Sequence, residues 1–323
     1  MNNMLRLNLM LVTTLAVAFI MSLMAGRVWI PLDHWISGDL KSIIIMDLRL
    51  PRACLGVVVG AGLGMAGAAM QGYLRNPLAD PGLFGVSSSA ALGAVISLYF
   101  GYAASAYLLP LFALFGAALG MAVLALLAGR SGSLIVFTLS GVILSSLTGS
   151  ITALLISLSP SPFATSEIIN WLLGALTDRS WNDVQLAAPL TVVGMGILMA
   201  AGRSLDGLTL GSAAAQSLGI NMTRLQWMIV IGVGLCVGTS VAVAGIIGFV
   251  GLMVPHLMRP LTQHSPSALL LPSALAGALL LLLADCIVRV MPSVSELRLG
   301  IAMSLLGAPF FMALLFKMRR EIA

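Results

Sequence analysis

The sequence has 323 residues, of which 59% are hydrophobic and only 8% are charged, and its formal net charge is +5. So few polar side chains cannot cover a water-soluble globule of this length, which excludes that class and predicts an integral membrane protein. The mean hydropathy of +1.07 points the same way.

Long stretches without Asp, Glu, Lys or Arg mark the expected membrane spans, because a spanning helix needs about 20 mostly apolar residues. The first, 7–26, is longer than the apolar part of a usual secretory signal, so we interpret it as a retained helix. The others follow in chain order: 53–74, two spans within 81–129 that turn at 101–107, one within 131–166 that ends at a Ser-Pro repeat, 184–202, 225–256, 260–284 and 299–316.

Nine or ten spans fit these stretches, and the charges at the two ends of the chain decide between them. Arg6 and the basic stretch 317–320 both predict a cytoplasmic location, and two cytoplasmic ends require an even number. We therefore predict an all-α membrane protein of ten helices, with one transmembrane domain over residues 1–323. The stretch 225–256 must then hold two elements, with a glycine-rich break at 244–251.

Two arginines flank Pro51 at the outer start of the second span, against the usual insertion bias. Pro51 is expected to keep this segment extended, so that Arg49 and Arg52 display their guanidinium groups at the membrane edge. Anionic lipid or a plain surface charge is an equally good interpretation of these residues alone. Arg289 differs, because Asp285 precedes it by four residues, the spacing of a stabilising helical ion pair.

Two spans carry small residues at helical spacing. Gly56, Gly60 and Gly64 recur every four residues in the second span, which predicts close packing against a neighbouring helix. In the fifth span a small polar stripe recurs at steps of three and four residues, and it either lines a polar route or bonds back to its own helix. The members of the stripe are Thr138, Gly141, Ser145, Thr148 and Thr152.

The longest polar segment on the cytoplasmic side, 203–224, joins the sixth and seventh spans. Asp206 and Ser212 are suited to capping short helices, and the small residues that follow end at Gly219, a typical C-cap. Such a small-residue surface suits docking by another protein. A mere connector is the alternative, although more than about 20 residues is long for one.

No catalytic or nucleotide-binding motif occurs in the sequence. It lacks G-x-S-x-G and H-E-x-x-H, and neither Lys41 nor Lys317 follows a glycine, as a P-loop requires. The three cysteines, Cys54, Cys236 and Cys286, lack metal-ligand spacing and are expected to be buried apolar residues. We therefore expect a non-catalytic protein without cofactor or metal. If it pumps with ATP, a partner must supply the nucleotide site.

Several segments together resemble one known family. They are RLPR (49–52), GAGLGMAGAAMQGYLRNPLADPGLFGVSSSA (60–90), AAAQSLGIN (213–221), AGIIGFVGLMVPHLMR (244–259), LLLADCIVR (281–289) and ELRLGIAMSLLGAPFF (296–311). In order and spacing, over almost the whole chain from the second span onward, they resemble the FecCD-type permeases. These are the membrane subunits of type II ABC importers for iron chelates and cobalamin.

The resemblance implies a dimer of ten-helix subunits, either a homodimer or a pair of paralogues, in the inner (cytoplasmic) membrane with both termini cytoplasmic. Two cytoplasmic ABC ATPases would lie below it and a periplasmic substrate-binding protein above, with no nucleic-acid partner. The expected cargo is an iron(III) siderophore, with haem or cobalamin as alternatives. A stand-alone secondary transporter would need coupling-ion residues in mid-membrane, which the spans lack, and a scaffold would leave the polar stripe unexplained.

The resemblance also assigns roles to residues. Arg49, Arg52 and Arg289 match positions that receive glutamates of the binding protein. Residues 206–220 match the coupling helices that press into the ATPases, the fifth span lines the translocation pathway, and the turn before it is a gate. The residues concerned are, for ATPase coupling, Asp206, Gly211, Ser212, Ala213, Ala214, Ala215, Leu218 and Gly219; for the pathway, Thr138, Ser145, Thr148 and Thr152; and for the gate, Ser131, Gly132 and Ser133.

Overall fold

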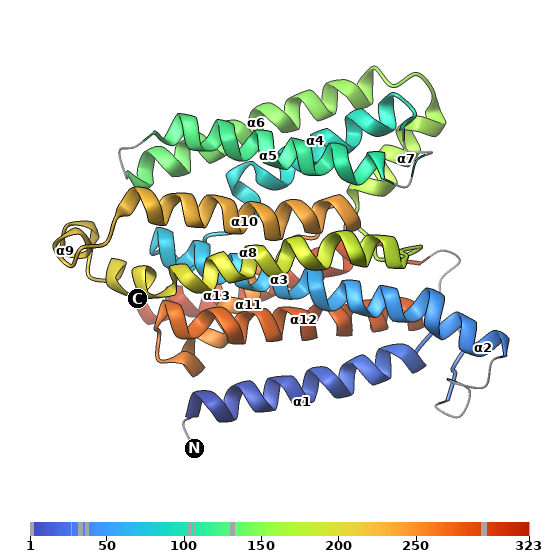
Figure 1. Cartoon of the computed structure of the whole chain (residues 1–323), viewed down its shortest axis with the longest axis horizontal. Coiled ribbons are helices and arrows are strands. Elements are labelled where there is room, and N and C mark those ends of the chain that lie inside the picture. Colours follow the sequence, from blue (N-terminus) through green and yellow to red (C-terminus); the bar gives the residue numbers. More distant parts are fainter. Residues whose placement is uncertain are drawn as a thin grey trace.

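The computed structural model describes residues 3–26, 28–31, 35, 39–102, 105, 107–129, 133–291 and 296–322. Helices lie side by side in one bundle, with α9 beyond one end and α2 beyond the other (Figure 1). We call the end with α9 the inner end and the end with α2 the outer end. The helices are α1 Asn3–Met24, α2 Leu40–Ile43, α3 Leu50–Leu74, α4 Val86–Tyr99, α5 Leu108–Ala128, α6 Leu134–Ser157, α7 Pro162–Leu172, α8 Trp181–Leu208, α9 Ser212–Ser217, α10 Met222–Ala244, α11 Val250–Met258, α12 Pro266–Val290 and α13 Leu299–Ile322, with shorter turns η2 Ile44–Arg49, η3 Pro81–Phe84 and η5 Arg259–Thr262.

Within the described residues, seven helices are long and apolar enough to cross a membrane. They correspond to seven of the ten predicted spans; the other three are the short helices α4 and α11 and the helix α13, whose apolar part is 299–314. The chain before α4 and before α11 is not helical, at 76–80 and 245–249, which leaves both helices short. The predicted break at 244–251 is therefore confirmed, and three of the ten predicted elements fall short of a full apolar span.

The helix α3 forms the centre of the bundle and packs against α8, α10, α11 and α12. Its closest approach is to α12, where the backbone of Gly60 meets that of Gly277 and Gly64 meets the carbonyl of Ser273. A Cβ atom on either Gly60 or Gly277 would collide with the other's carbonyl oxygen. The predicted close packing of the glycine stripe is therefore confirmed, and it fixes α3 and α12 as one unit.

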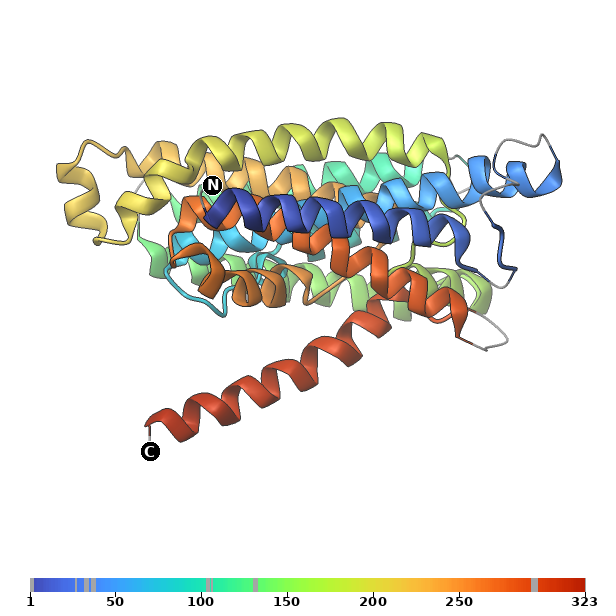
Figure 2. The ribbon, with the colours of Figure 1, turned by 90° about the horizontal axis from the view of Figure 1, so that it is seen from below.

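Several helices leave large apolar faces uncovered, and α6 and α13 are two of them. The helix α13 diverges from the rest of the bundle toward its C-terminal end (Figure 2), and α6 forms one side of the bundle (Figure 1). Membrane proteins expose such faces either to lipid or to another helix. The exposed apolar side chains are Leu305, Leu306 and Met312 on α13, and Ile135, Leu139, Ile143, Leu147 and Leu154 on α6.

Candidate functional site

A buried ion-pair network joins three elements at the outer end of the bundle. Arg52, in the first turn of α3, donates to Asp285 of α12 from Nε at 3.0 Å and from Nη2 at 2.9 Å. The same Nη2 lies 2.9 Å from Glu296, just before α13, and Thr177 donates to Glu296 at 3.0 Å. Partial burial would raise the pKa of Glu296, but the hydrogen bond and charge of Arg52 outweigh it and lower that pKa.

The other two arginines of this network hold the C-terminal end of α1. Arg49 donates to the carbonyl oxygens of Leu23 at 2.9 Å and Met24 at 2.8 Å. Arg289 donates to the carbonyl oxygen of Ala25 at 3.3 Å, and its Nε lies 3.1 Å from Asp285. The last carbonyls of a helix lack intrahelical donors and carry negative partial charge, so two cations satisfy them well. The predicted Asp285–Arg289 pair is confirmed.

The expected conformation around Pro51 is wrong. Pro51 is the second residue of α3 and directly follows the π-helical turn η2, and the helical path is continuous from Leu40. Arg49 and Arg52 are each only 9% exposed and Arg289 is 5% exposed, so none is displayed at the membrane edge. Internal carboxylates and carbonyls already occupy their donors. A docking role for these arginines stays a prediction, and it requires their present contacts to be exchanged.

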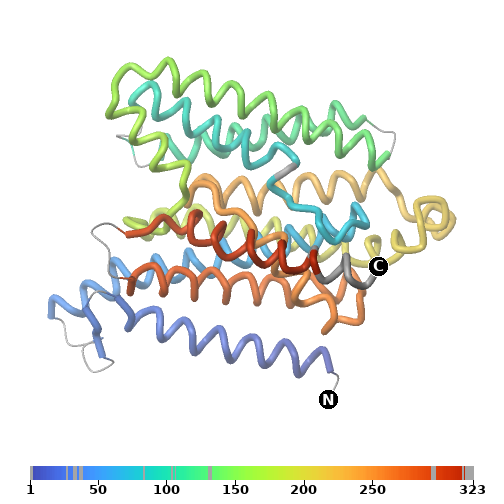
Figure 3. The backbone as a smooth tube through the Cα atoms, turned by 180° about the vertical axis from the view of Figure 1, so that it is seen from behind, coloured from blue at the N-terminus to red at the C-terminus, as the bar shows by residue number. Residues whose placement is uncertain are grey.

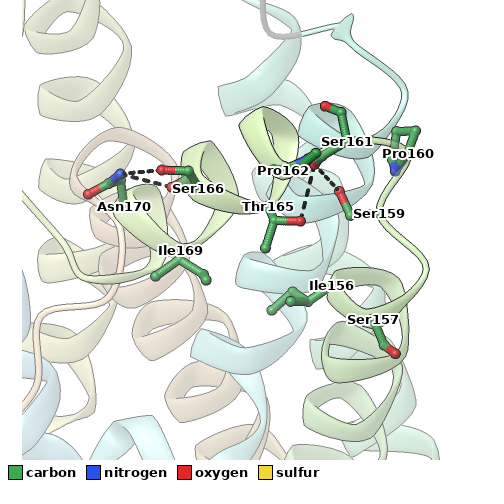
Figure 4. A pocket seen from close by; sticks show the side chains of 10 residues that line it. All are labelled: Ile156, Ser157, Ser159, Pro160, Ser161, Pro162, Thr165, Ser166, Ile169 and Asn170. Atoms are coloured by element: carbon green, nitrogen blue, oxygen red, sulfur yellow. Dashed lines mark hydrogen bonds between the residues drawn. The ribbon is translucent and has the colours of Figure 1, made fainter.

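A hollow of about 600 Å³ opens at the outer end of the bundle, where α6 ends and α7 begins (Figure 4). Ser161 caps α7 by accepting from the N–H of Ala164 at 3.2 Å, and Asn170 donates to the carbonyl oxygen of Ser166 at 2.9 Å. Hydroxyl and amide groups on this wall can both donate and accept hydrogen bonds. The polar side chains that line the hollow are Ser157, Ser159, Ser161, Thr165, Ser166 and Asn170.

The sequence analysis did not identify this hollow as a site, although the Ser-Pro repeat at 159–162, which it took only as the end of a span, forms part of its wall. Arg298 adds a positive charge at its edge, because its Nη2 donates to the side-chain oxygen of Asn170 at 3.3 Å. Arg179 lies close enough to Arg298 for the two charges to repel. Burial first, and then Arg298, lower the pKa of Arg179, although Asp183 and Asp178 act in the opposite direction.

The polar stripe of α6 faces its own chain, because each of its members is buried or half-buried. Thr148 and Thr152 are buried within the chain and donate to the carbonyls of Leu144 and Thr148, at 2.8 and 2.9 Å. Thr138 also bonds back to its own helix, but it lines a hollow of about 370 Å³ at the inner end of α6. Ser145 is half-buried.

The predicted helical period of the stripe is confirmed, since Thr148 and Thr152 point into their own chain, whereas Ser146 and Ser150 are exposed. Of the two interpretations of the stripe, the hydrogen bonds of Thr138, Thr148 and Thr152 agree with hydroxyls that bond back to their own helix. A role for Thr138, Ser145, Thr148 and Thr152 in a translocation pathway stays a prediction.

The predicted gate lies at the inner end of α6. Ser131 and Gly132 lie outside the described residues. Ser133 is the N-cap of α6, and its hydroxyl accepts from the N–H of Val136 at 3.4 Å. A capping serine stabilises the first turn of a helix, so this contact gives Ser133 a structural role. Gating by 131–133 stays a prediction.

The predicted coupling segment forms the projection at the inner end of the bundle (Figure 1). Gly211 is the N-cap of α9, and its φ of 102° suits glycine. Leu218 is 64% exposed and Gly219 turns the chain with a φ of 84°, whereas Ala215 is fully buried. The surface that another protein can reach consists of Ser212, Ala213, Gln216, Ser217, Leu218 and Gly219.

Asp206 does not cap α9; its carboxylate binds the N-terminal end of α12 instead. Its Oδ1 accepts from the N–H of Ser267 at 2.9 Å and from the hydroxyl of Ser265 at 3.1 Å, so it holds the N-terminal end of α12. A carboxylate is favourable at that end of a helix. The segment that leads into α9 is thereby tied to α12, the same helix that carries Asp285 at its outer end.

Comparisons with known proteins agree with this architecture. A model of the FecCD transport family matches residues 14–317. An Fe(3+)-citrate import permease of Bacillus subtilis (strain 168) is 40% identical over 87% of this chain and 84% of its own. An Fe(3+) dicitrate transport permease of Escherichia coli (strain K12) is 36% identical over 97% of this chain and 100% of its own.

A vitamin B12 import permease of Vibrio cholerae serotype O1 (strain ATCC 39315 / El Tor Inaba N16961) is 37% identical over 92% of this chain and 90% of its own. Among solved structures, one described as a metal-chelate type ABC transporter in an inward-facing conformation superposes with a TM-score of 0.89. It is 31% identical, and the match covers 97% of this chain and 99% of that one. The bundle is therefore an all-helical permease fold of the type II ABC importers.

Proposed function

This chain belongs to the FecCD transport family, and from that membership we propose that it is the membrane-spanning permease subunit of an ABC importer that carries an iron(III) chelate into the cell. The observation that carries the proposal is the family match over nearly all of the chain. It is supported by the polar hollow of about 600 Å³ at the outer end, whose hydroxyl and amide groups suit an oxygen-rich chelate.

The preferred cargo is a ferric chelate, because relatives named for ferric citrate reach 36% and 40% identity. Cobalamin is the alternative, since a vitamin B12 permease is 37% identical, and haem is a further member of the same class. Uptake by cells that lack the chain, with and without its return on a plasmid, separates these cargoes. Radioactive iron is supplied as a citrate or trihydroxamate complex and compared with labelled cobalamin. If cells without the chain lose cobalamin uptake but keep iron uptake, the proposal of an iron(III) chelate as cargo is contradicted.

A cytoplasmic ATPase, in two copies per importer, is the partner that we propose for the inner end. The exposed face of α9 and Leu218 offers small and apolar side chains that a cleft can enclose. No transport subunit of this kind hydrolyses ATP by itself, so the energy must come through that contact. We also propose an inner-membrane location with both termini cytoplasmic, which is supported by the position of the first turn of α1 and the end of α13 at the end that carries α9 (Figure 1).

A periplasmic substrate-binding protein is the partner that we propose for the outer end, with Arg49, Arg52 and Arg289 as its contacts. Glu296 is 27% exposed in its side chain, whereas Asp285 is 1% exposed. An incoming glutamate can therefore reach Arg52 by replacing Glu296 and leaving Asp285 in place. Docking would then exchange one carboxylate for another instead of filling an empty position.

A second permease subunit, identical or a close paralogue, is the partner that we propose for the uncovered faces of α6 and α13. Purification of the tagged chain from native membranes in mild detergent tests all three partners at once. One P-loop ATPase per copy of this chain, together with a dimeric permease, is the expected result. If the chain purifies in a stable form without an ATPase, the proposal of an ABC importer is overturned and a stand-alone transporter is favoured.

A further inference from the structure

The segment between α3 and α4 turns back into the bundle instead of staying at its inner surface. Pro81 lies against Gly251 of α11, and Phe84 lies against Gly141 of α6. Leu63, which lines the same cavity as Pro81, stands about three turns before the C-terminal end of α3, which is about 16 Å along the helix. Asp80 therefore lies deep in the bundle and not in the cytoplasmic loop that its sequence position indicates.

Asp80 faces a cavity of about 250 Å³. Its Oδ1 accepts from the N–H of Gly82 at 2.7 Å, and no other charged side chain among the described residues lines the cavity. Ser87 and Ser88 add two hydroxyls, and the non-helical backbone of 246–248 forms the opposite wall. The cavity thus combines a carboxylate with groups that accept hydrogen bonds.

Two helices begin at this cavity, which explains how a carboxylate persists there. The first turns of α4 and α11 contribute Ser87, Ser88 and Gly251 to its wall, and neither helix has a side-chain cap at its N-terminus. The positive ends of both helix dipoles offset part of the cost of a buried negative charge. Broken helices that meet at mid-depth are a recurring way to build substrate sites in transporters.

The cavity opens on the side of the bundle where α6 and α13 leave their apolar faces uncovered. Ser87 and Ser88 are half-buried, and Ile246 is 36% exposed. Figure 3 shows the segment 75–86 between α6 and α13. The same two helices are linked to it by contacts, since Phe84 packs on α6 and Phe249, which lines the cavity, packs on Gly307 of α13.

We propose that Asp80, Ser87 and Ser88 form a mid-membrane subsite that binds cationic or hydrogen-bond-donating groups of the cargo during its passage. Asp80 accepts from ammonium, hydroxyl or amide groups, and it repels free carboxylates. The identity of the cargo rests on the proposed function, but the negative site itself does not. The subsite suits chelates that carry hydroxyl or amide groups, because such groups donate hydrogen bonds to a carboxylate.

The test measures the sign of the charge at the cavity with the purified full-length chain in lipid nanodiscs. Cys54, Cys236 and Cys286 are first replaced by alanine, and Ser87→Cys is added as the reporter. Its modification rates with a cationic and with an anionic methanethiosulfonate reagent are then compared, with and without Asp80→Asn. Ser166→Cys in the outer hollow is the matched control, because it is remote from Asp80 in the sequence and lines a different cavity.

We expect the ratio of the cationic to the anionic modification rate at the Ser87→Cys reporter to be roughly tenfold higher with Asp80 than with Asp80→Asn. Asp80→Glu should keep the higher ratio, and neither substitution should change the ratio at the Ser166→Cys control. The same ratio with Asp80 and with Asp80→Asn, or no modification by either reagent, would overturn the subsite. The measurement needs neither ATP nor cargo, so its result is independent of whether the importer reading holds.

Discussion

The guanidinium group of Arg52 donates to the carboxylate of Asp285 through both Nε and Nη2, although the two residues are 233 positions apart in the chain. Asp285 also pairs with Arg289 at 3.1 Å, so this carboxylate contacts two cations. Its side chain is 1% exposed. The outer ends of α3 and α12 are thereby joined by a charge contact that water hardly reaches.

Asp285→Asn is expected to destabilise the protein by about 3 kcal/mol or more, because removing one partner of a buried ion pair leaves uncompensated charge. Thermal unfolding of the purified chain in detergent measures this loss. Glu167→Gln is the matched control, since Glu167 is exposed and should change stability little. Equal melting temperatures for the two variants would show that the network contributes nothing to the fold.

Gly277→Ala should separate α3 from α12. The new Cβ would collide with the carbonyl oxygen of Gly60, a backbone atom that cannot rotate away, and overpacking of this kind costs about 1–3 kcal/mol. Gly149→Ala in α6 is the control, because a Cβ there meets nothing within 4 Å. The same unfolding assay applies. If Gly277→Ala is as stable as Gly149→Ala, the tight α3–α12 contact is not needed.

Acid should weaken the outer network through Glu296. The pKa of Glu296 is lowered from its ordinary 4.5 in the folded protein. Its contribution to stability is therefore complete above pH 4.5 and is lost as the pH falls through the lower folded value. Melting temperatures recorded on descending pH should fall more steeply for the wild type than for Glu296→Gln. Parallel curves would mean that another group is responsible.

Removing the charge of Glu296, which should weaken the fold, should strengthen docking of the binding protein. Glu296→Gln keeps an acceptor for Thr177, but its neutral amide holds Arg52 less strongly than the carboxylate does. A glutamate of the binding protein then displaces it more easily, so affinity for the binding protein should rise roughly fivefold. Arg52→Gln should lower that affinity. Surface plasmon resonance on nanodisc-embedded importer provides the measurement, with Glu167→Gln as control. An unchanged affinity in Glu296→Gln would exclude carboxylate exchange at Arg52.

Leu218→Asp should release the ATPase while leaving the fold intact. The Leu218 side chain is 64% exposed, so a charge there costs the isolated chain little, whereas it cannot enter an apolar cleft of a partner. Ala213→Ser, at another exposed position of the same segment, is the control. Co-purification of the ATPase at the wild-type ratio with Leu218→Asp would contradict the proposed contact.

Local sequence patterns predicted the helices well, because composition and glycine spacing act over one or two turns. The break between Ala244 and Val250 and the close packing at Gly60 are examples, and both are confirmed. Pro51 was misjudged for a specific reason. Proline disfavours a helix in its interior but is compatible with its first turn, and sequence alone does not say where a helix begins.

The sites were harder to predict, because they depend on contacts between distant segments. Arg52 meets Asp285 and Glu296 only after α3, α12 and the start of α13 have packed. Asp80 is similar, since its charge and its neighbouring proline indicate a surface loop. The packing of Pro81 on Gly251 and of Phe84 on Gly141, which the sequence does not reveal, carries the segment inward. The period of the α6 stripe was visible, whereas the neighbours that decide which way it faces were not.

The helix α12 is held by hydrogen bonds at both of its ends. Asp206, next to the coupling segment, holds its first turn, and Arg52 binds Asp285 in its last turns. Between these two contacts α12 runs as one helix, Pro266–Val290. The coupling segment and the outer ion-pair network are therefore fastened to the same element, so a shift of α12 would displace both.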